Sequence, residues 1–318
     1  MTESPIIITT GDPAGVGPDL CLDVLLGDCP RAVVVAGDRD VLARRAEMLK
    51  VPFNIADYDG GAHHRAVLHC AAAKTEVCGQ PSSDNAAHVL AQLDAAIDGC
   101  LQGRFLAMTT GPVNKQIINE AGFEFCGQTE YVAARVSAPH PVMLLAGQQM
   151  RVALATRHVP LSKVSAALSV DDLSMTLRVL DSGLRQYFTN GRAPYVAVAG
   201  LNPHAGEDGA FGDEEARIIR PAIERAIHDG VNVEGPFSAD SMFKFVRADC
   251  YLAMYHDQGL PVIKYADFDN TVNATLGLPF LRTSPDHGTA ADLAGKGVVS
   301  PHSMRAAVQL AATASTVS

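Results

Sequence analysis

The chain has 318 residues, of which 47% are hydrophobic and 19% charged, and its formal net charge is -10. This length favours about two domains, and the composition is typical of a compact globular protein. No basic cluster is visible, which argues against a nucleic-acid partner, because binding to a phosphate backbone needs a basic face. Small-molecule chemistry is therefore the better expectation.

The cysteines and the N-terminus bear on the cellular compartment. The seven cysteines form no Cys-x-x-Cys pair, which argues against a disulfide framework and against a zinc ribbon. Residues 1–8 lack the basic start and the long apolar core of a signal peptide. No segment approaches the roughly 18 uninterrupted apolar residues of a membrane span. We therefore expect a cytoplasmic protein with no membrane partner.

Short β-branched runs alternate with longer helical patterns along the chain, which indicates βαβ units and a largely parallel sheet. The predicted class is thus α/β. Pro112 is well placed to open a helix. In chain order, strands are predicted over 6–9, 31–36, 105–110, 142–145, 152–156, 196–199 and 252–254, and helices over 84–103, near 171–188 and near 213–228.

Three histidines each follow an apolar stretch that is typical of a buried strand. They are His158, His204 and His256. Ligands of open α/β sheets gather outside the carboxyl ends of the strands, so three imidazoles delivered there suit a divalent metal. The alternative is that each histidine caps its own strand end through backbone contacts, without a metal. The residue pattern leaves both interpretations open.

A glycine-rich loop, residues 10–19, follows the first predicted strand. Its glycines at positions 11, 15 and 17 do not match the G-x-G-x-x-G order of a dinucleotide fingerprint, and no Walker-type Gly-Lys-Ser/Thr follows. Ligand binding and a simple tight turn that brings the next helix close to the sheet are both open.

Three further segments carry polar groups that suit an anionic ligand. Thr129 is predicted to cap a helix that runs through Arg135, which makes an anion site with Gln128 as a further donor. Lys264 and Arg282 are cations in apolar surroundings, although ordinary surface ion pairs would also explain them. Residues 286–297 form a polar loop with several glycines, and the periodicity of the sequence does not reveal which ligand this loop holds.

Four motifs, in order and with their spacing intact, resemble the PdxA family of 4-hydroxythreonine-4-phosphate dehydrogenases. The resemblance runs from Thr9 to about residue 310. The glycine-rich loop and the segment 287–297 also resemble the wider isocitrate and isopropylmalate dehydrogenase superfamily. The motifs are Thr110-Gly-Pro-Val-Asn-Lys, Leu201-Asn-Pro-His-Ala-Gly-Glu, Met254-Tyr-His-Asp-Gln-Gly-Leu-Pro-Val-Ile-Lys and Thr275-Leu-Gly-Leu-Pro-Phe-Leu-Arg-Thr-Ser-Pro-Asp-His-Gly-Thr-Ala.

The resemblance implies a two-domain α/β/α sandwich of the isocitrate/isopropylmalate dehydrogenase-like type, with NAD and substrate in a cleft between the domains. Residues 1–126 and 276–318 would form the first domain, and residues 127–275 the second, which carries the metal ligands and the dimer contacts. A homodimer is implied, with an active site shared between its subunits. The cofactors implied are NAD or NADP and one divalent metal per site, Zn²⁺, Mg²⁺ or Co²⁺.

The resemblance also implies residue roles. The family commonly has a histidine where this chain has Gln128, and this departure leaves the substrate identity open, because glutamine carries no positive charge. The implied metal ligands are His158, His204 and His256, drawn from both subunits; the substrate contacts are Gln128, Thr129, Lys264, Asn273 and Arg282; the cofactor contacts are His287, Gly288, Thr289, Ala290, Asp292 and Gly295; and the catalytic residues are Lys264, as base or relay, and Asp257.

The implied reaction is oxidation of 4-phosphooxy-L-threonine, a small phosphorylated amino acid. Metal coordination acidifies the C3 hydroxyl, a base removes its proton, and C3 gives hydride to the nicotinamide. The β-keto acid then loses carbon dioxide to give an amino-ketone phosphate. Three alternatives stay open: a dehydrogenase of the same family acting on a phosphorylated threonate or erythronate or on a cyclic diol acid, a phosphate acyltransferase, and a non-catalytic binding protein.

Overall fold

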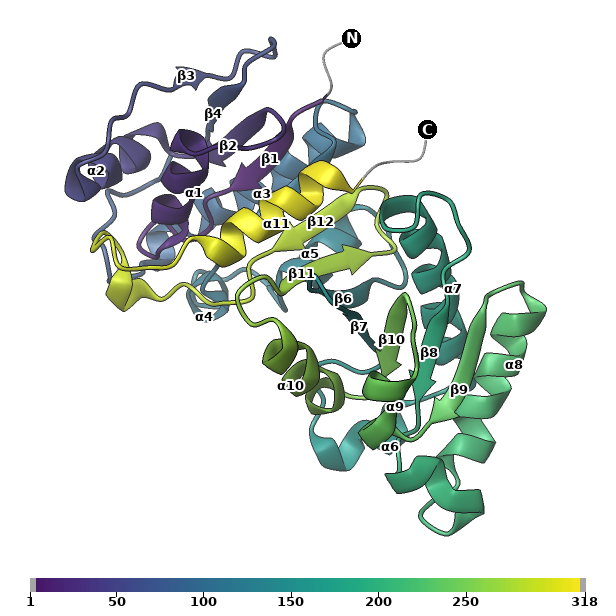
Figure 1. The fold of residues 1–318 in the computed structure, drawn as a ribbon. Helices are drawn as coiled ribbons and strands as arrows, with labels where there is room; N and C mark the ends of the chain where they lie inside the picture. The colour runs from purple at the N-terminus through teal and green to yellow at the C-terminus, as the bar shows by residue number, and fades with distance from the viewer. Residues whose placement is uncertain (1–3, 315–318) are drawn as a thin grey trace. The chain divides into compact units, whose positions relative to one another are not determined.

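The computed structural model describes residues 4–314. These residues form two compact units. Unit 1 takes residues 4–139 and 278–313, and unit 2 takes residues 140–277 and residue 314. Each unit contains β-strands covered by helices, so the predicted α/β class is confirmed (Figure 1). No helix within the described residues is both long and apolar enough to cross a membrane.

The sheet of unit 1 is parallel throughout, with its strands in the order β3-β4-β2-β1-β5-β12. Its last strand comes from the end of the chain and pairs with β5, Leu281 opposite Ala107. The strands are β1 (Ile6–Thr9), β2 (Val33–Gly37), β3 (Ala56–Asp57), β4 (Arg65–His69), β5 (Ala107–Thr110) and β12 (Leu281–Ser284).

Two sets of helices cover the sheet of unit 1. Ile7 and Met108 belong to the buried cluster that contains one face of α3, whereas α11 packs on β12, β5 and β1 (Figure 1). Since strand side chains alternate between faces, Ile6 and Ile8 point away from that cluster. The helices are α1 (Gly17–Leu26), α2 (Arg39–Leu49), α3 (Ala86–Leu101), α4 (Lys115–Glu120), α5 (Gln128–Arg135) and α11 (His302–Thr313).

The sheet of unit 2 is mixed, with its strands in the order β11-β6-β7-β10-β8-β9. β6 runs antiparallel to both β7 and β11, while β7, β10, β8 and β9 are parallel. The strands are β6 (Val142–Ala146), β7 (Arg151–Leu154), β8 (Val196–Ala199), β9 (Val233–Phe237), β10 (Cys250–Ala253) and β11 (Val272–Leu276).

The buried cluster of unit 2 contains Leu145, Val152, Ala197 and Ala253 from four of its strands, together with Ile263 of α10. α7 packs on β6, β11 and α8. The helices are α6 (Val164–Ala167), α7 (Val170–Tyr187), α8 (Arg220–His228), α9 (Ala239–Phe245) and α10 (His256–Ala266).

The units differ at their boundaries from the domains expected from the sequence. Residues 127–139, expected in the second domain, fold with unit 1. Tyr131 donates to Asp94 of α3 at 2.9 Å, and Arg135 donates to the same carboxylate at 2.8 Å. Val132 is buried in the core cluster of unit 1. These contacts attach α5 to α3.

Two helix starts also differ from expectation. Pro112 does not open a helix: α4 begins three residues later, with Asn114 as its N-cap accepting from Ile117 N at 3.2 Å. The side-chain oxygen of Asn114 therefore caps the helix, which a proline side chain cannot do because it has no hydrogen-bond acceptor. The helix expected near 213–228 starts as a π-helical turn, Glu215–Ile219, and continues as α8.

Candidate active site

The three histidines lie beyond the carboxyl ends of neighbouring strands in unit 2. β10 pairs in parallel with β7 on one side and with β8 on the other. His158 follows β7, His204 follows β8, and His256 is the first residue of α10, which follows β10. All three are therefore delivered to one edge of the unit 2 sheet.

Two of the imidazoles lie close together. The ring centroids of His158 and His256 are 5.6 Å apart. Thr156 supports this spacing, because its backbone N–H and its hydroxyl both donate to Met254 O, at 3.1 and 2.7 Å. His158 comes two residues after Thr156, and His256 comes two residues after Met254, so this contact holds the two segments together.

Asp257 contacts one of these rings. Its Oδ1 lies 2.7 Å from Nδ1 of His256. A carboxylate at Nδ1 favours a proton on that nitrogen and leaves the lone pair on Nε2, which is the arrangement that metal-binding histidines use. Asp257 therefore has the geometry to orient His256, in addition to the catalytic role predicted from the sequence.

Gln258 links the start of α10 to the segment that carries His204. Its Oε1 accepts from Met254 N at 2.6 Å, and its Nε2 donates to Gly200 O at 2.7 Å. A Cβ on Gly259, the next residue, would lie 2.6 Å from Val152 Cγ1, so glycine lets α10 approach β7 closely.

His204 begins a left-handed turn. Residues 204–208 all have φ between 40° and 83°, and only Gly206 among them is a glycine. The left-handed conformation costs an L-residue about 1–2 kcal/mol. Such strain persists only where the surrounding structure imposes it, and it is commonly found at functional sites.

The donor types suit a transition metal, but one chain brings only part of a site together. Within residues 4–314, no group of three His, Cys, Asp or Glu side chains is placed to hold a metal ion. His158 and His256 form a pair, and His204 stands on its own turn. The pair fits a partial ligand set, which further donors would have to complete.

Lys264 and Asn273 are also in unit 2. Lys264 lies on α10, with its Nζ 5.8 Å from the ring centroid of Phe268. Asn273 lies on β11, and its Oδ1 is buried without a hydrogen-bond partner among the described residues. A buried amide oxygen in this state can accept a hydrogen bond from a ligand.

Arg282, on β12, is a buried cation of unit 1, only 3% exposed. Its guanidinium donates to Thr129 Oγ1 at 3.1 Å and to Thr110 Oγ1 at 2.9 Å. Burial lowers the pKa of Arg282 to about 10, while Glu130 acts in the opposite direction. The guanidinium stays charged at neutral pH, which suits a phosphate or a carboxylate.

Gln128 and Thr129 form the first turn of α5. The predicted capping role of Thr129 is wrong: no side chain caps this helix, whose N-cap is Gly127, and Thr129 accepts from Arg282 instead. Gln128 Nε2 donates to Gly111 O at 3.0 Å, which leaves Oε1 buried with no partner in residues 4–314. The helix N-terminus adds backbone donors.

The backbone N–H groups of the glycine-rich loop already donate to acceptors of the protein itself, which favours the tight-turn interpretation over a phosphate cradle. A Cβ on Gly17 would lie 1.8 Å from Thr10 O, so this close approach requires glycine. The hydrogen bonds of these N–H groups are Gly11 N to Gln92 Oε1 (2.9 Å), Asp12 N to Pro112 O (3.0 Å), Ala14 N to Asp12 Oδ1 (2.9 Å), Gly15 N to Asp12 O (3.1 Å) and Val16 N to Thr289 O (2.9 Å).

The loop of residues 286–297 is anchored to this turn. Gly295 N donates to Asp19 Oδ1 at 2.8 Å. A Cβ on Gly15 would lie 2.9 Å from Thr289 O, which shows how closely the two loops pack. All the predicted cofactor contacts lie in this loop: His287, Gly288, Thr289, Ala290, Asp292 and Gly295.

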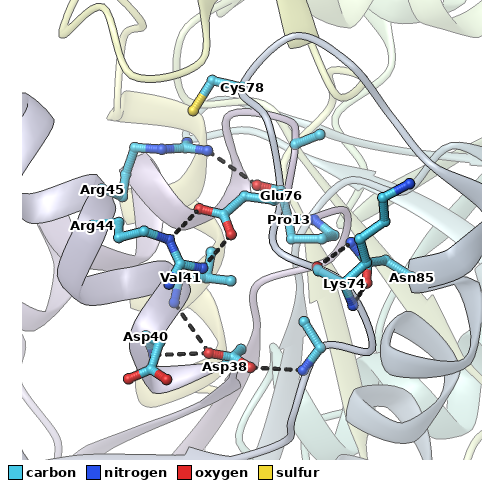
Figure 2. A network of polar contacts seen from close by, with 12 residues as sticks. Pro13, Asp38, Asp40, Val41, Arg44, Arg45, Lys74, Glu76, Cys78 and Asn85 are labelled. Atoms are coloured by element: carbon cyan, nitrogen blue, oxygen red, sulfur yellow. Dashed lines mark hydrogen bonds and ion pairs between the residues drawn. The ribbon is translucent and has the colours of Figure 1, made fainter.

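Arg45, on α2, supports both loops. Its side chain is fully buried and forms an ion pair with Asp19. It also donates to Gly15 O at 2.9 Å and to Pro13 O at 3.0 Å (Figure 2). One buried cation therefore binds the carbonyls of the glycine-rich loop and the carboxylate that holds Gly295.

The loop of residues 72–80 is attached to the same helix. Asp38, the N-cap of α2, accepts from Ala72 N at 2.6 Å. Glu76 pairs with Arg44, as Figure 2 shows. These contacts hold the loop next to the start of α2.

Sequence reasoning did not single out several of these residues. Asp19 lay at the end of the glycine-rich loop, and Gln258 lay inside a recognised motif, yet neither position predicted a partner. Arg45, Glu214 and Glu215 carry no motif signal, because charged residues are ordinary on helices. The burial of Arg45 and Glu215, and the contacts of all three residues, become visible only in three dimensions.

Comparison with known proteins bears directly on this arrangement. The family described as "Pyridoxal phosphate biosynthetic protein PdxA" matches residues 28–311. The chain belongs to the PdxA family. A relative of this PdxA chain, 4-hydroxythreonine-4-phosphate dehydrogenase from Azoarcus sp. (strain BH72), is 48% identical over 98% of this chain and 96% of its own length. The resemblance drawn from the four motifs is confirmed.

Solved structures agree with the PdxA assignment. The 4-hydroxythreonine-4-phosphate dehydrogenase from Klebsiella pneumoniae is 32% identical, with a TM-score of 0.89 over 97% of this chain and 98% of its own. A terephthalate 1,2-cis-dihydrodioldehydrogenase from Burkholderia xenovorans LB400 is 26% identical, with a TM-score of 0.72 over 99% of each chain.

Proposed function

We propose that this PdxA-family protein oxidises 4-phosphooxy-L-threonine at C3 with NAD or NADP. The product, 2-amino-3-oxo-4-phosphooxybutanoate, would lose carbon dioxide to give 3-amino-2-oxopropyl phosphate for pyridoxal phosphate biosynthesis. The observation that carries the proposal is 48% identity, over almost the whole chain, to a relative named 4-hydroxythreonine-4-phosphate dehydrogenase.

The substrate phosphate would bind Arg282 and the first turn of α5. Arg282 is a buried cation that already donates to Thr129, so a phosphate beside that hydroxyl would receive charge-assisted hydrogen bonds. The α5 N-terminus would add backbone N–H groups and the positive end of its dipole. These groups supply the charge that Gln128 lacks.

The proposed metal ligands are His158, His204 and His256. Imidazole donors favour Zn²⁺ or Co²⁺ over Mg²⁺, which prefers oxygen. When bound, the cation would acidify the substrate hydroxyl. Asp257 would hold His256 with Nε2 available. Lys264 would accept the hydroxyl proton, directly or as a relay, while C3 transfers hydride to the nicotinamide.

A homodimer would complete the metal site. Contiguous exposed apolar patches commonly mark interaction surfaces, and five of the exposed apolar side chains of unit 2 lie on or next to the segments that carry the histidines. Leu161 follows His158, and the ring of Phe211 lies 6.2 Å from that of His204. The exposed residues are Leu161 (73%), Phe211 (51%), Phe245 (79%), Tyr265 (95%) and Phe268 (72%).

The loop of residues 286–297 would hold NAD or NADP. Its contacts to the glycine-rich loop and to Asp19 anchor it, which would reduce the ordering that ligand binding requires. Ala290, in the left-handed conformation with φ 38°, directs the chain between Thr289 and Asp292. These loop residues, rather than the glycine-rich turn, are therefore the proposed cofactor contacts.

Gln128 suits a substrate that carries hydroxyl or amino groups, which 4-phosphooxy-L-threonine and the alternative substrates both do. Because Gln128 Nε2 is bonded to Gly111 O, its buried Oε1 is the atom left to meet a ligand, and a carbonyl oxygen accepts from a hydroxyl or an amine. A phosphorylated threonate or erythronate, or a cyclic diol acid, would offer such hydroxyls. One similar structure is a dihydrodiol dehydrogenase.

A substrate panel tests the proposal. NADH and NADPH formation would be followed with 4-phosphooxy-L-threonine, phosphorylated threonate and erythronate, and a cyclic cis-diol carboxylate, each with and without a chelator. We expect kcat/KM for 4-phosphooxy-L-threonine to exceed the others by at least about tenfold, which is 1.4 kcal/mol, and to be lost with the chelator. A preference for the diol acid would favour the alternative, and no turnover of any substrate in the panel would contradict all of the proposed substrates.

A further inference from the structure

Glu215 lies against the loop that carries His204. Its side chain belongs to a residue only 3% exposed. Oε1 accepts from Leu201 N and from Asn202 N, both at 2.8 Å, and Oε2 accepts from Asn202 Nδ2 at 3.0 Å. The carboxylate thus binds three N–H groups of the two residues that precede Pro203 and His204.

The loop is shaped around this carboxylate. A Cβ on Gly206 would lie 2.7 Å from Glu215 Oε2, and one on Gly200 would lie 2.8 Å from Ala205 Cα. Glycine is therefore required at both positions for the turn to close on the side chain. Glu215 is also the first residue of the π-helical turn before α8, a feature that recurs at functional sites.

Glu214 extends the contact to a second histidine segment. Its Oε2 accepts from Asn202 Nδ2 at 2.7 Å, and its Oε1 accepts from Ser165 Oγ at 2.6 Å. Ser165 lies on α6, in the segment that follows His158. The two neighbouring carboxylates therefore join the segments of His158 and His204.

We propose that Glu215, supported by Glu214, is a positioning residue that holds the left-handed turn so that His204 can bind a divalent cation. The inference rests on the proposed metal-binding function. Without this acceptor, the N–H groups of Leu201 and Asn202 would lose their buried partner, and the strained turn would relax. Groups that orient a ligand without touching the metal typically change metal affinity roughly 10- to 100-fold.

The test compares Co²⁺ binding by the full-length protein and three variants. Glu215→Gln keeps the shape but replaces one acceptor oxygen with a donor NH₂, and Asn202→Ala removes the donor that both carboxylates share. Glu224→Gln makes the same chemical change at an exposed position of α8 and is the control. Affinity is measured by competition with a chelator, ligand geometry by the Co²⁺ visible spectrum, and folding of the metal-free protein by circular dichroism.

We expect Co²⁺ affinity to fall roughly 10- to 100-fold in Glu215→Gln, with a changed Co²⁺ spectrum, to fall less in Asn202→Ala, and to stay unchanged in Glu224→Gln. A lower melting temperature with unchanged affinity and spectrum would show a purely structural role and overturn the inference. If Glu215→Gln does not fold, unchanged affinity in Asn202→Ala overturns it.

His204→Ala separates this inference from the function on which it rests. If the wild-type protein binds no Co²⁺, or if His204→Ala binds Co²⁺ as the wild type does, the proposed metal site itself is wrong. If His204→Ala loses the metal while Glu215→Gln retains wild-type affinity, only the positioning role of Glu215 is overturned.

Discussion

Arg282 keeps a full positive charge almost entirely out of water. Two threonine hydroxyls, of Thr110 and Thr129, accept from its guanidinium, and Glu130 acts on its charge as well. Burial lowers the pKa of Arg282 to about 10, so protonation persists at neutral pH but at a cost in free energy. A bound phosphate would offset part of that cost, which supports the proposed role of this cation as an anchor for an anionic substrate.

Replacing Arg282 with lysine should weaken substrate binding. A hydrogen bond to a charged group contributes about 1.5–3 kcal/mol, and lysine lacks the planar fork, so KM should rise roughly 10- to 100-fold. Steady-state kinetics with 4-phosphooxy-L-threonine measures this change. Arg135→Lys, an exposed cation paired with Asp94, is the control and should change KM less than about twofold. An unchanged KM in Arg282→Lys would remove Arg282 from the phosphate site.

His88 makes stability depend on pH. It is buried on α3, with its Nε2 2.7 Å from Gln92 Nε2, and Gln92 in turn binds Gly11 of the glycine-rich loop. Burial lowers the pKa of His88, partly opposed by the charge of Asp38. The unfolded chain therefore takes up a proton at a higher pH than the folded protein does.

Stability should fall as pH drops through the ordinary histidine pKa of about 6.5, because the unfolded state then binds more protons. We expect the free energy of unfolding of the wild type, measured with urea at pH 7.5 and 5.5, to decrease more than that of His88→Asn. The matched control His228→Asn changes an exposed histidine and should decrease like the wild type. Equal pH dependence in wild type and His88→Asn would contradict the assignment.

Among the helices, α10 carries several of the proposed functional residues in one short segment. It begins at His256, continues through Asp257 and Gln258, and reaches Lys264. Its first turn lies against β7 and β10 because Gly259 has no side chain. The position of His256 therefore depends on how closely this helix approaches the sheet.

Gly259→Ala should push α10 away from the sheet. The new Cβ would lie 2.6 Å from Val152 Cγ1 and 3.0 Å from Ala253 Cβ. Overpacking of this kind typically costs about 1–3 kcal/mol of unfolding free energy, and Co²⁺ affinity should fall with it. Urea unfolding measures the first effect. For stability, Gly288→Ala is the control, since a Cβ there meets nothing within 4 Å. Equal stability of the two variants would show that α10 can move without cost.

The seven predicted strands all match strands of the structure, but β3, β4, β9, β11 and β12 were not predicted, and neither were the strand directions. The strands predicted at 142–145 and 152–156 correspond to β6 and β7, which run antiparallel. The apolar residues of a strand form the same sequence pattern whether the strand runs parallel or antiparallel to its neighbour. The short connection, closed by Gly147 N donating to Met150 O at 3.0 Å, was the available signal, because parallel neighbours need a crossover of about a dozen residues.

The candidate site likewise has parts that the sequence predicted and parts that it did not. The strand ends predicted from the sequence indicated where His158, His204 and His256 stand, because locating the end of a strand needs only the local periodicity of apolar residues. The anchoring of Asp19 by Arg45 joins positions on different helices, and the contact of Glu215 with residues 201–202 depends on an unusual turn. Neither has a local pattern from which it could be predicted.

At the scale of the whole molecule, the exposed apolar side chains of unit 2 are the feature most in need of a partner. Phe245 is 79% exposed on α9, which contacts the turn that carries His204. A second copy of the chain is the proposed partner, since it would cover these side chains and contribute a histidine.

Phe245→Glu should therefore shift the proposed dimer to monomer and weaken Co²⁺ binding while each chain stays folded. Analytical ultracentrifugation gives the mass, and the chelator competition gives the affinity. Ile227→Glu, at an exposed apolar position of α8, is the control and should remain dimeric. Full Co²⁺ affinity in a monomeric Phe245→Glu protein would show that one chain suffices.

The place of β12 has a consequence for how the protein is made. β12 pairs with β5, and α11 packs on both, yet the ribosome delivers them only after the whole of residues 140–277. At about 5–20 residues per second, the free edge of β5 waits on the order of ten to thirty seconds during synthesis. The same late segment carries Arg282 and the loop of residues 286–297. A nascent chain therefore acquires the proposed phosphate and nucleotide contacts last, so neither proposed ligand can assist the folding of the earlier strands.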